Sequence, residues 1–549
     1  MKELIKKIID DASNSLKLEL GHTIGPIKYT IEVPKNNKNG DFASNIAFVL
    51  SHLIRKKPIE VAKNLINLMD RSSFDRVEIA GTGFINFFVG HSFFYRYLDK
   101  VVKDERIFYS NIGDNKQIQI EFISANPTGP LHIGHGRGAV IGDSLARILT
   151  VCGYKVTKEY YLNDVGNQIN NLGASIMFRY KELLNISDTF PDDGYKGDYI
   201  TDIAKIILDR RGDSLLKLPA RDAIKECSEF GEKYMIDIIK HDLEMLDIKF
   251  DIWFSEKSLY DDQYVEKAIT LLRENEFVYT SGGAVWFRST SFNDDKDRVL
   301  KRSNGDYTYF ASDIAYHLNK FERGFDKVID IWGSDHHGYI KRLKSSIKAL
   351  GLDDKNLDVI LIQMLNIIEK GKRVSMSTRR NEFIPLKWLI NNVGKDALRY
   401  FYLMRTHDSQ FDFDMDLAKS RTSDNPVYYV QYAYARVKSI FRNAMQKGIG
   451  YTLGNGLERL ELIEEIELIK KIYSFKDATE QAAINYTPHR LTYYLHELAG
   501  LFHNYYYNNK ILVENDLTLT SGRISLSYAV SKTIKQGLNL IGVDAPERM

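Results

Sequence analysis

Cysteine is scarce in this chain, and its scarcity excludes several kinds of site. Only Cys152 and Cys227 occur among the 549 residues, too far apart for a Cys-x-x-Cys pair. A cysteine-rich zinc knuckle is therefore excluded, and a disulfide framework is not expected. The same composition favours a reducing compartment, so we expect a cytoplasmic protein that carries no zinc.

Long apolar runs, a large net charge and internal repeats are also missing. The most apolar stretch, residues 359–368, is interrupted by Gln363 and Asn366 and falls short of the ~18 residues of a membrane helix. The 75 Lys+Arg and 73 Asp+Glu leave a net charge of +2, which excludes a histone-like polycation but allows a local nucleic-acid surface. Residues 1–16 carry charges throughout, so we expect no signal peptide. The lack of repeats argues against solenoids and propellers.

What is present is the composition of a globular protein, with 44% hydrophobic and 27% charged residues. The length suggests about three or four domains. Residues 1–108 read as a small α/β domain, in which residues 77–89 form two short strands around a glycine turn. The polar stretch 109–116 is a plausible linker, and residues 415–549 show only helical patterns.

Residues 116–410 between these parts predict a catalytic α/β domain. An apolar strand up to Ile123, a glycine-rich turn, a helix ended by Gly153 and a second strand form a βαβ unit, which requires a parallel sheet. Residues 165–290 are mostly helical and charged, and a second strand-helix-strand stretch follows them. We therefore expect one nucleotide-binding sheet, split by an insertion at about 165–290.

The strongest local signal is Pro130-Leu131-His132-Ile133-Gly134-His135-Gly136, placed where the first strand gives way to a helix. A helix start offers unpaired N–H groups and a positive dipole end, which suit phosphate. Gly134 and Gly136 let a ligand approach the backbone. His132 and His135 share one face, and each ring donates a hydrogen bond to a phosphoryl oxygen. The alternative is two structural histidines at a helix cap.

These residues carry a family resemblance. His132-Ile133-Gly134-His135 resembles the HIGH signature of class I aminoacyl-tRNA synthetases, and the residues from Glu121 to Pro130 narrow the resemblance to arginyl-tRNA synthetases. Matching segments follow in the family's order at residues 160–168, 307–317, 332–338 and 396–399.

The resemblance implies both a fold and an activity. The implied fold is a Rossmann-like catalytic domain with a helical insertion, a small α/β N-terminal domain and an all-α anticodon-binding bundle of the DALR type. The implied activity is arginine–tRNA ligation, with ATP and Mg²⁺, L-arginine and tRNA(Arg) as substrates and partners, in a monomer that contacts no membrane.

Candidate arginine-binding residues follow from guanidinium chemistry and from the resemblance. A guanidinium donates to carboxylates in bidentate fashion, and buried carboxylates are costly unless a cation arrives. The resemblance implies that Glu121 and Asp313 hold the guanidinium. It also places four residues around the amino acid: Ser124, Asn126, Tyr309 and His336. The alternatives are a surface residue on an edge strand for Glu121 and a helix N-cap for Asp313.

Candidate ATP-binding residues cluster after a second strand, residues 328–332. There Asp335 is expected to accept ribose hydroxyls, and Gly333 leaves room for adenosine. A plain loop with a capping Asp is the alternative. The other residues that the resemblance places at ATP are Pro130, Gly134, Gly136, His336, Met364, Met376 and Ser377.

The second class I signature, KMSKS, is altered here to Ser375-Met376-Ser377-Thr378-Arg379. Serine and threonine replace both lysines, and Gly129 stands where some arginyl enzymes carry a compensating lysine. We expect Arg379 to meet the ATP phosphates, because a guanidinium bridges two phosphate oxygens, with Lys372 as the next candidate. The alternative is a solvated basic surface.

Transfer-RNA contacts are expected at both ends of the chain. Residues 419–549 hold 13 of the 33 tyrosines, and rings among cations suit the stacking of loop bases. The resemblance adds Asn45 and Phe48 as contacts to the tRNA elbow. A tyrosine-rich helical core is the alternative. Two other functions stay open: a class I synthetase for another amino acid such as lysine, and a non-catalytic tRNA-binding protein derived from a synthetase.

Overall fold

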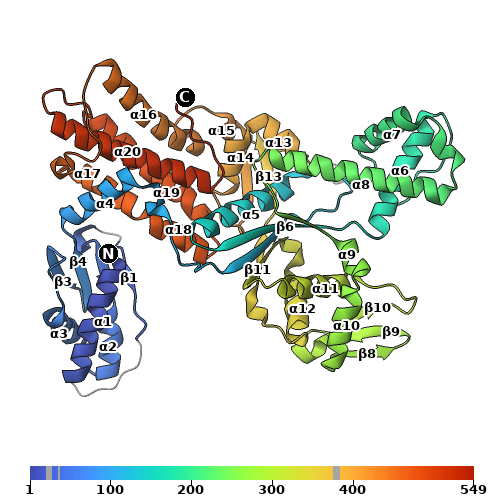
Figure 1. Ribbon diagram of the computed structural model, residues 1–549, viewed down its shortest axis with the longest axis horizontal. Helices are drawn as coiled ribbons and strands as arrows, with labels where there is room; N and C mark the ends of the chain where they lie inside the picture. Colours follow the sequence, from blue (N-terminus) through green and yellow to red (C-terminus); the bar gives the residue numbers. More distant parts are fainter. Residues whose placement is uncertain (20–26, 35–36, 375–383) are drawn as a thin grey trace. The chain divides into compact units, whose positions relative to one another are not determined.

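The computed structural model describes residues 1–19, 27–34, 37–374 and 384–549 (Figure 1). Its contacts divide the chain into two compact units. The first unit joins Met1–Lys103 with Tyr451–Tyr473 and Val513–Leu526, and the second unit holds the remaining residues. The sequence boundaries at 108 and 415 stay a prediction. None of the described helices is long and apolar enough to cross a membrane.

The first unit is built on an antiparallel sheet with the strand order β1-β2-β4-β3 among the described residues. Its strands are β1 (Ile31–Glu32), β2 (Phe42–Ser44), β3 (Arg76–Ala80) and β4 (Phe84–Phe88). Gly81 and Gly83, in the turn between β3 and β4, have φ values of 56° and 149°, a backbone conformation that favours glycine. The two short strands predicted around a glycine turn are therefore confirmed.

Helices from both ends of the sequence complete the first unit. They are α1 (Lys2–Glu19), α2 (Ile46–Ile54), α3 (Pro58–Leu68), α4 (His91–Lys103) and α17 (Ile463–Tyr473). The Tyr473 ring packs edge-on against Phe42 and Phe94, with centroids 6.3 and 6.0 Å away. This core therefore includes a residue from the last fifth of the chain.

The second unit is built on a parallel sheet with the described strand order β12-β11-β5-β6-β7. Its strands are β5 (Gln117–Phe122), β6 (Lys155–Leu162), β7 (Ile252–Ser255), β11 (Lys327–Gly333) and β12 (Leu357–Ile362). Helix α5 (Ile133–Val151) connects β5 to β6, as the βαβ pattern predicted. Strands that follow β5 in sequence are added on one side of the sheet, and the strand that follows β11 is added on the other side. The carboxyl ends of β5 and β11 therefore form the switch point where ligands of such sheets bind.

The segment predicted as a helical insertion contributes to this sheet. Residues 165–290 contain the helices α6 (Asn167–Leu183), α7 (Asp198–Arg211), α8 (Ala220–Glu244), α9 (Glu256–Asp261) and α10 (Tyr264–Glu274). Strand β7 lies among them and pairs with β6. A small antiparallel sheet follows, made of β8 (Val278–Ser281), β9 (Ala284–Phe287) and β10 (Arg298–Lys301). Strand β7 has four residues, too few to show a strand periodicity in the sequence.

The remaining elements of the second unit surround the switch point and extend toward the C-terminus. Near the sheet lie α11 (Tyr309–Glu322), α12 (His337–Ala349), β13 (Leu365–Glu369), β14 (Lys372–Arg373), α13 (Leu386–Val393), α14 (Lys395–Tyr402) and β15 (Phe411–Asp414). The helices that follow are α15 (Met415–Lys419), α16 (Pro426–Gln446), α18 (Phe475–Ile484), α19 (His489–Asn508) and α20 (Leu517–Leu540), of which α20 begins in the first unit. The helical C-terminal pattern is thus confirmed for the described residues.

Candidate active site

The HIGH segment (residues 132–135) caps the N-terminus of α5 with its own imidazoles. The Nδ1 atom of His132 accepts from the backbone N–H of Gly134 at 3.1 Å and of His135 at 3.3 Å. The Nδ1 atom of His135 accepts from the backbone N–H of His132 at 3.3 Å. Because each Nδ1 is an acceptor, a neutral ring carries its proton on Nε2. The predicted cap is thus present, and it fixes the tautomer in which both imidazoles carry their proton on Nε2.

Burial keeps both imidazoles neutral. It lowers the pKa of His132, and it lowers that of His135 to about 3, with the neighbouring His132 adding a smaller effect. The two rings stack with their centroids 3.5 Å apart. Neutral rings avoid the repulsion of two stacked cations and donate hydrogen bonds without titrating near neutral pH.

The two glycines of the segment have different surroundings. A Cβ on Gly136 would lie 2.4 Å from Leu386 of α13 and 3.2 Å from Tyr402 of α14, so glycine here has a packing reason. A Cβ on Gly134 would lie 3.0 Å from the His132 ring and 3.9 Å from the Met364 sulfur. Gly134 and Met364 are therefore neighbours, and the Met364 side chain is exposed.

Part of the predicted phosphate site lies outside the described residues. Met376, Ser377 and Arg379 belong to residues 375–383, which the structure does not describe. The chain that follows is held against the HIGH segment: Leu386 N–H donates to the Leu131 carbonyl at 2.8 Å, and Ile133 N–H donates to the Ile384 carbonyl at 3.1 Å. The chain that precedes ends in the exposed strand β14, which carries Lys372.

Glu121 is buried on the central strand of the sheet, which excludes the edge-strand alternative. Its Oε1 accepts from the Ser124 hydroxyl at 2.7 Å, and its Oε2 accepts from the Lys320 ammonium at 2.5 Å. Burial raises the pKa of Glu121, an effect that Lys320 partly offsets. Glu121 is therefore an oriented acceptor in the candidate site.

The turn after β5 is strained, which places Ser124. Ile123 and Ser124 have φ values of 72° and 42°, in the left-handed region that a β-branched isoleucine rarely adopts. Ser124 is held there because its hydroxyl donates to Glu121 and accepts from the Tyr161 N–H at 3.2 Å. Two residues on, the Asn126 amide donates to the Gln168 side chain at 2.6 Å.

Asp313 lies in the body of α11, where it joins other carboxylates. The helix N-cap is Thr308, so the N-cap interpretation of Asp313 is wrong. The Tyr339 hydroxyl donates to Asp313 Oδ2. Burial raises the pKa of Asp313, and the hydrogen bond from Tyr339 opposes that rise.

Glu256 is a further acid at this place, and the sequence analysis missed it. It begins α9 directly after β7 and is 2% exposed. Burial raises its pKa to about 7, with the carboxylates of Asp313 and Asp164 contributing. The Tyr161 hydroxyl interacts with Glu256, Asp313 and Glu121. Burial is the main reason that its pKa is raised well above 10, and these carboxylates raise it further. These three carboxylates, called here the acid cluster, are costly to ionise in this buried place unless a cation lies beside them. A Ser-Glu pair after a strand was the only signal in the sequence.

The loop after β11 is open. Gly333, Asp335 and His336 are exposed, and a Cβ on Gly333 would lie 2.4 Å from Asp335 Oδ1. The short helix that follows Gly333 has no side-chain cap, so the capping-Asp interpretation fails. The Tyr309 side chain, at the start of α11, is 59% exposed. Within the described residues, no group of three or more His, Cys, Asp or Glu side chains is arranged to hold a metal ion.

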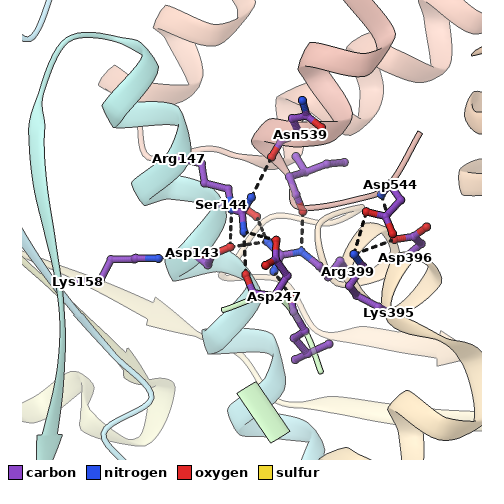
Figure 2. Close-up of polar contacts among 12 residues, drawn as sticks. Asp143, Ser144, Arg147, Lys158, Asp247, Lys395, Asp396, Arg399, Asn539 and Asp544 are labelled. Atoms are coloured by element: carbon purple, nitrogen blue, oxygen red, sulfur yellow. Dashed lines mark hydrogen bonds and ion pairs between the residues drawn. The ribbon is translucent and has the colours of Figure 1, made fainter. Parts of the chain in front are cut away.

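A buried arginine joins the HIGH helix to the C-terminal segment (Figure 2). Arg399 of α14 is fully buried and donates to Asp143 of α5 at 2.7 Å, and its other nitrogens donate to the carbonyls of Ile541 and Leu246 at 2.8 and 2.7 Å. Asp396, three residues earlier, accepts from the Asp544 N–H at 3.1 Å. Residues 396 and 399 thus tie α5 and α14 to the end of the chain.

Aromatic rings and a cation line up across α16 and α19. Tyr428 and Tyr432 stack with centroids 6.0 Å apart. The Arg436 guanidinium lies 4.6 Å from the Tyr432 ring and 4.8 Å from the Tyr506 ring. Because Tyr432 is 38% exposed, part of this ladder faces solvent, unlike a tyrosine core.

In the first unit, Asn45 Oδ1 accepts from the Thr30 N–H at 2.8 Å.

Phe48 lies one turn after Asn45 on α2 and packs on an exposed ring. Its centroid is 4.9 Å from that of Phe84, which is 40% exposed. The two predicted elbow residues therefore lie on one helix start of the first unit, beside an accessible aromatic surface.

Three family models match the chain in succession. They are the arginyl tRNA synthetase N-terminal domain over residues 1–89, the class I tRNA synthetase (R) catalytic domain over residues 98–408, and the DALR anticodon binding domain over residues 430–549. The catalytic-domain match alone covers more than half of the chain.

Curated relatives match the sequence of this chain along nearly its whole length. An arginine–tRNA ligase of Citrifermentans bemidjiense is 47% identical over 94% of each chain, and one of Syntrophotalea carbinolica is 44% identical over 100% of each. The arginyl-tRNA synthetase structure of Thermus thermophilus has the same fold, with a TM-score of 0.76 over 99% of this chain and 100% of that one at 21% identity. The predicted resemblance and fold class are both confirmed. The chain belongs to the arginyl-tRNA synthetase family of class I aminoacyl-tRNA synthetases.

Proposed function

We propose that this chain is an arginine–tRNA ligase that activates L-arginine with ATP and transfers it to the 3′ end of tRNA(Arg). The observation that carries the proposal is the acid cluster, whose members Glu121 and Glu256 stand at the carboxyl ends of β5 and β7, on a sheet whose HIGH segment begins helix α5 with two neutral imidazoles. One site accepts a cation and the other accepts phosphate, which are the two ends of the activation reaction.

Arginine is held by its guanidinium. Its five N–H groups form a planar fork that matches several carboxylate oxygens. No ion pair within the described residues neutralises Asp313 or Glu256, so both are open to a guanidinium, and Glu121 offers the oriented Oε1. Ser124, Asn126, Tyr309 and His336 lie around the rest of the amino acid in this proposal.

Activation is an in-line displacement. A carboxylate oxygen of arginine attacks the α-phosphorus of ATP, the bond to the bridging oxygen of pyrophosphate breaks, and arginyl-adenylate forms. His132 and His135 donate from Nε2 to phosphoryl oxygens as charge develops there. Arg379, with Lys372 next, meets the leaving pyrophosphate. The protein supplies no covalent nucleophile, and Pro130, Gly134, Gly333, Asp335 and Met364 position the nucleotide.

Magnesium enters this proposal only as the counter-ion of the ATP phosphates. The described residues form no dedicated metal site, so no step is assigned to a protein-bound ion. When it is bound to ATP, Mg²⁺ neutralises phosphate charge.

Transfer needs the tRNA. A hydroxyl of the 3′-terminal ribose attacks the arginyl carbonyl carbon. The bond between that carbon and the phosphate oxygen breaks, and AMP leaves. The ladder of Tyr428, Tyr432, Arg436 and Tyr506 suits unstacked anticodon bases, because rings and guanidinium stack on every base. We place the tRNA elbow at Asn45 and Phe48, and we propose that the enzyme acts as a cytoplasmic monomer.

An aminoacylation assay tests the function. Purified protein, ATP with Mg²⁺, radiolabelled amino acid and tRNA(Arg) transcript should yield acid-precipitable arginyl-tRNA, and lysine with tRNA(Lys) should yield none. Charging with lysine would establish the other class I specificity. No charging with either amino acid, from protein whose circular dichroism shows a folded chain, would favour a non-catalytic tRNA-binding protein.

A further inference from the structure

Three carboxylates form a row across the central sheet. Glu121 on β5 stands in register with Glu159 on β6 and with Asp330 on β11. All three are buried, with exposed fractions of 7%, 0% and 0%. Three adjacent anions in a dry environment repel one another and are poorly solvated, so the fold must supply cations beside them.

Helix α11 and the turn after it present a histidine and two cations to this row at three-residue spacing. His317 Nε2 lies 2.8 Å from Asp330 Oδ2. Arg323 donates to both oxygens of Glu159, at 2.5 and 2.9 Å. Lys320, between them, is fully buried and is shared: it donates to Glu121 Oε2 at 2.5 Å and to Asp330 Oδ1 at 2.7 Å.

Of these groups, Lys320 is the one that contacts a side-chain oxygen of a candidate arginine ligand, whereas His317 contacts the backbone carbonyl of Asp313 at 2.7 Å. It occupies Oε2 of Glu121, and Ser124 occupies Oε1 from the other side, so the carboxylate has one orientation. Each carboxylate oxygen has two acceptor sites, so Oε1 keeps capacity for a guanidinium N–H. Helix α11 also carries Asp313, seven residues before Lys320 on the same helical face.

We propose that Lys320 is a positioning residue for arginine, whose shared ion pair with Glu121 and Asp330 orients the Glu121 carboxylate and docks the face of α11 that bears Asp313. The proposal rests on the function proposed above. Lys320 does not contact the substrate; it determines where the two carboxylates on β5 and α11 meet the guanidinium.

The electrostatics around Glu121 give this role a measurable sign. The groups that face it are Lys320, Tyr316 and Arg323 from α11 and its end, Asp330 from β11, Glu159 and Tyr161 from β6, and Ser124. Burial raises the pKa of Glu121, Lys320 lowers it and Asp330 raises it. Removing the ammonium therefore raises the pKa of Glu121 further, so less of it is ionised at a given pH.

The test is a steady-state comparison of wild type with Lys320→Met and Lys320→Arg in the full-length enzyme with tRNA(Arg). We expect Lys320→Met to raise KM for arginine by about tenfold or more, with KM for ATP within about twofold. The acidic limb of the pH profile of kcat/KM for arginine should move to higher pH. Lys320→Arg should recover most of both changes, because it restores the charge.

Arg323→Met is the matched control. It removes a cation from the same row, but its carboxylate partner is Glu159, so it should lower the melting temperature and raise KM for arginine much less than Lys320→Met does. If Lys320→Met keeps the wild-type KM and pH profile, or raises the KM values for arginine and ATP equally, Lys320 has only a structural role and the proposal is wrong.

A double variant keeps the test decisive if Lys320→Met does not fold. Lys320→Met with Asp330→Asn removes one positive and one negative charge from the row, so the buried charge balance is preserved. We expect a folded protein with a raised KM for arginine; a wild-type KM would overturn the proposal. Failure of wild type to charge tRNA(Arg) with arginine would instead refute the proposed function itself.

Discussion

Asp313 is partly buried, and no ion pair within the described part of the chain neutralises it, which makes it the clearest single-residue test of the arginine site. Its main contact is the Tyr339 hydroxyl, and an amide in its place can still accept that hydrogen bond. The structural consequence of Asp313→Asn should therefore be small, while the charge that attracts a guanidinium is lost.

We expect Asp313→Asn to reduce kcat/KM for arginine by about 30-fold to a few thousandfold, because losing one charge-assisted partner of a desolvated cation costs about 2–5 kcal/mol. Steady-state charging at saturating ATP and tRNA measures this. Tyr339→Phe is the control, because it removes the hydrogen bond and keeps the charge. An Asp313→Asn enzyme with wild-type arginine dependence would contradict our assignment of this residue.

Arg379 is the residue on which the altered second signature depends. Pyrophosphate departure develops negative charge, and this loop offers a guanidinium where the family pattern has a serine. Arg379→Ala should lower the turnover number by roughly 10²-fold, about 2.7 kcal/mol, with ATP binding little changed. Single-turnover kinetics with Thr378→Ala as control measures this. If excess tRNA restores full turnover, Arg379 only attracts tRNA, and Lys372 becomes the candidate.

At the scale of elements, Arg399 is the connection between the HIGH helix and the end of the chain. It links α14 to α5 through Asp143, as Figure 2 shows, and it links α14 to the segment after α20 through the Ile541 carbonyl. Asp143 also pairs with Arg147 and Lys158, at 2.7 and 3.1 Å. Three cations around one buried carboxylate explain why its pKa is lowered although burial opposes this.

Removing Arg399 should loosen this connection. Arg399→Met removes the guanidinium that pairs with buried Asp143 and leaves two backbone carbonyls without their donors. We therefore expect a loss of about 3–5 kcal/mol in the free energy of unfolding. Denaturant unfolding measures the loss. Arg147→Met, which removes a partly exposed partner of the same carboxylate, should cost clearly less. Equal losses in the two variants would mean that the carbonyl contacts of Arg399 contribute little.

At the scale of the whole molecule, buried acids with raised pKa values shape the dependence of stability on pH. Burial raises the pKa of Glu256 and of Glu232 to about 7 and that of Asp242 to about 6. The folded state therefore holds protons that the unfolded state has released. Stability from these groups is fully present below their ordinary pKa and is lost as pH rises from about 4.5 to 7.

These acids should accordingly lower the melting temperature of the free enzyme at pH 8 relative to pH 6, an effect that the lowered pKa values of His132 and His135 oppose and that Glu232→Gln should reduce. Arginine should raise the melting temperature more at pH 8, because the ionised acid cluster binds the cation and ionised Glu256 is the form that benefits. Calorimetry with and without arginine checks both statements. Glu256→Gln should flatten the pH dependence of the arginine effect; an unchanged dependence would remove Glu256 from the binding site.

Local patterns in the sequence were sufficient for the elements and for the family. The βαβ unit around residues 117–162, the HIGH cap and the β3–β4 hairpin follow from residue spacing and turn chemistry, because such signals lie within one or two turns of chain. The acid at Glu121 could also be predicted as a site residue, since a carboxylate within an apolar strand requires a partner.

Only the tertiary structure decided which partners meet. Glu256 lies near Asp313 because the four-residue strand β7 pairs with β6 at the edge of the sheet. Lys320 contacts Glu121 and Asp330 because α11 packs on strands that are distant in sequence. Gly136 packs against α13 and α14, which leave no room for a side chain. The sequence by itself thus determined the elements, the family and most candidate ligands. Packing across the sheet decided which buried charges share a cation, because Coulomb energies in a dry interior depend on distances that no local pattern encodes.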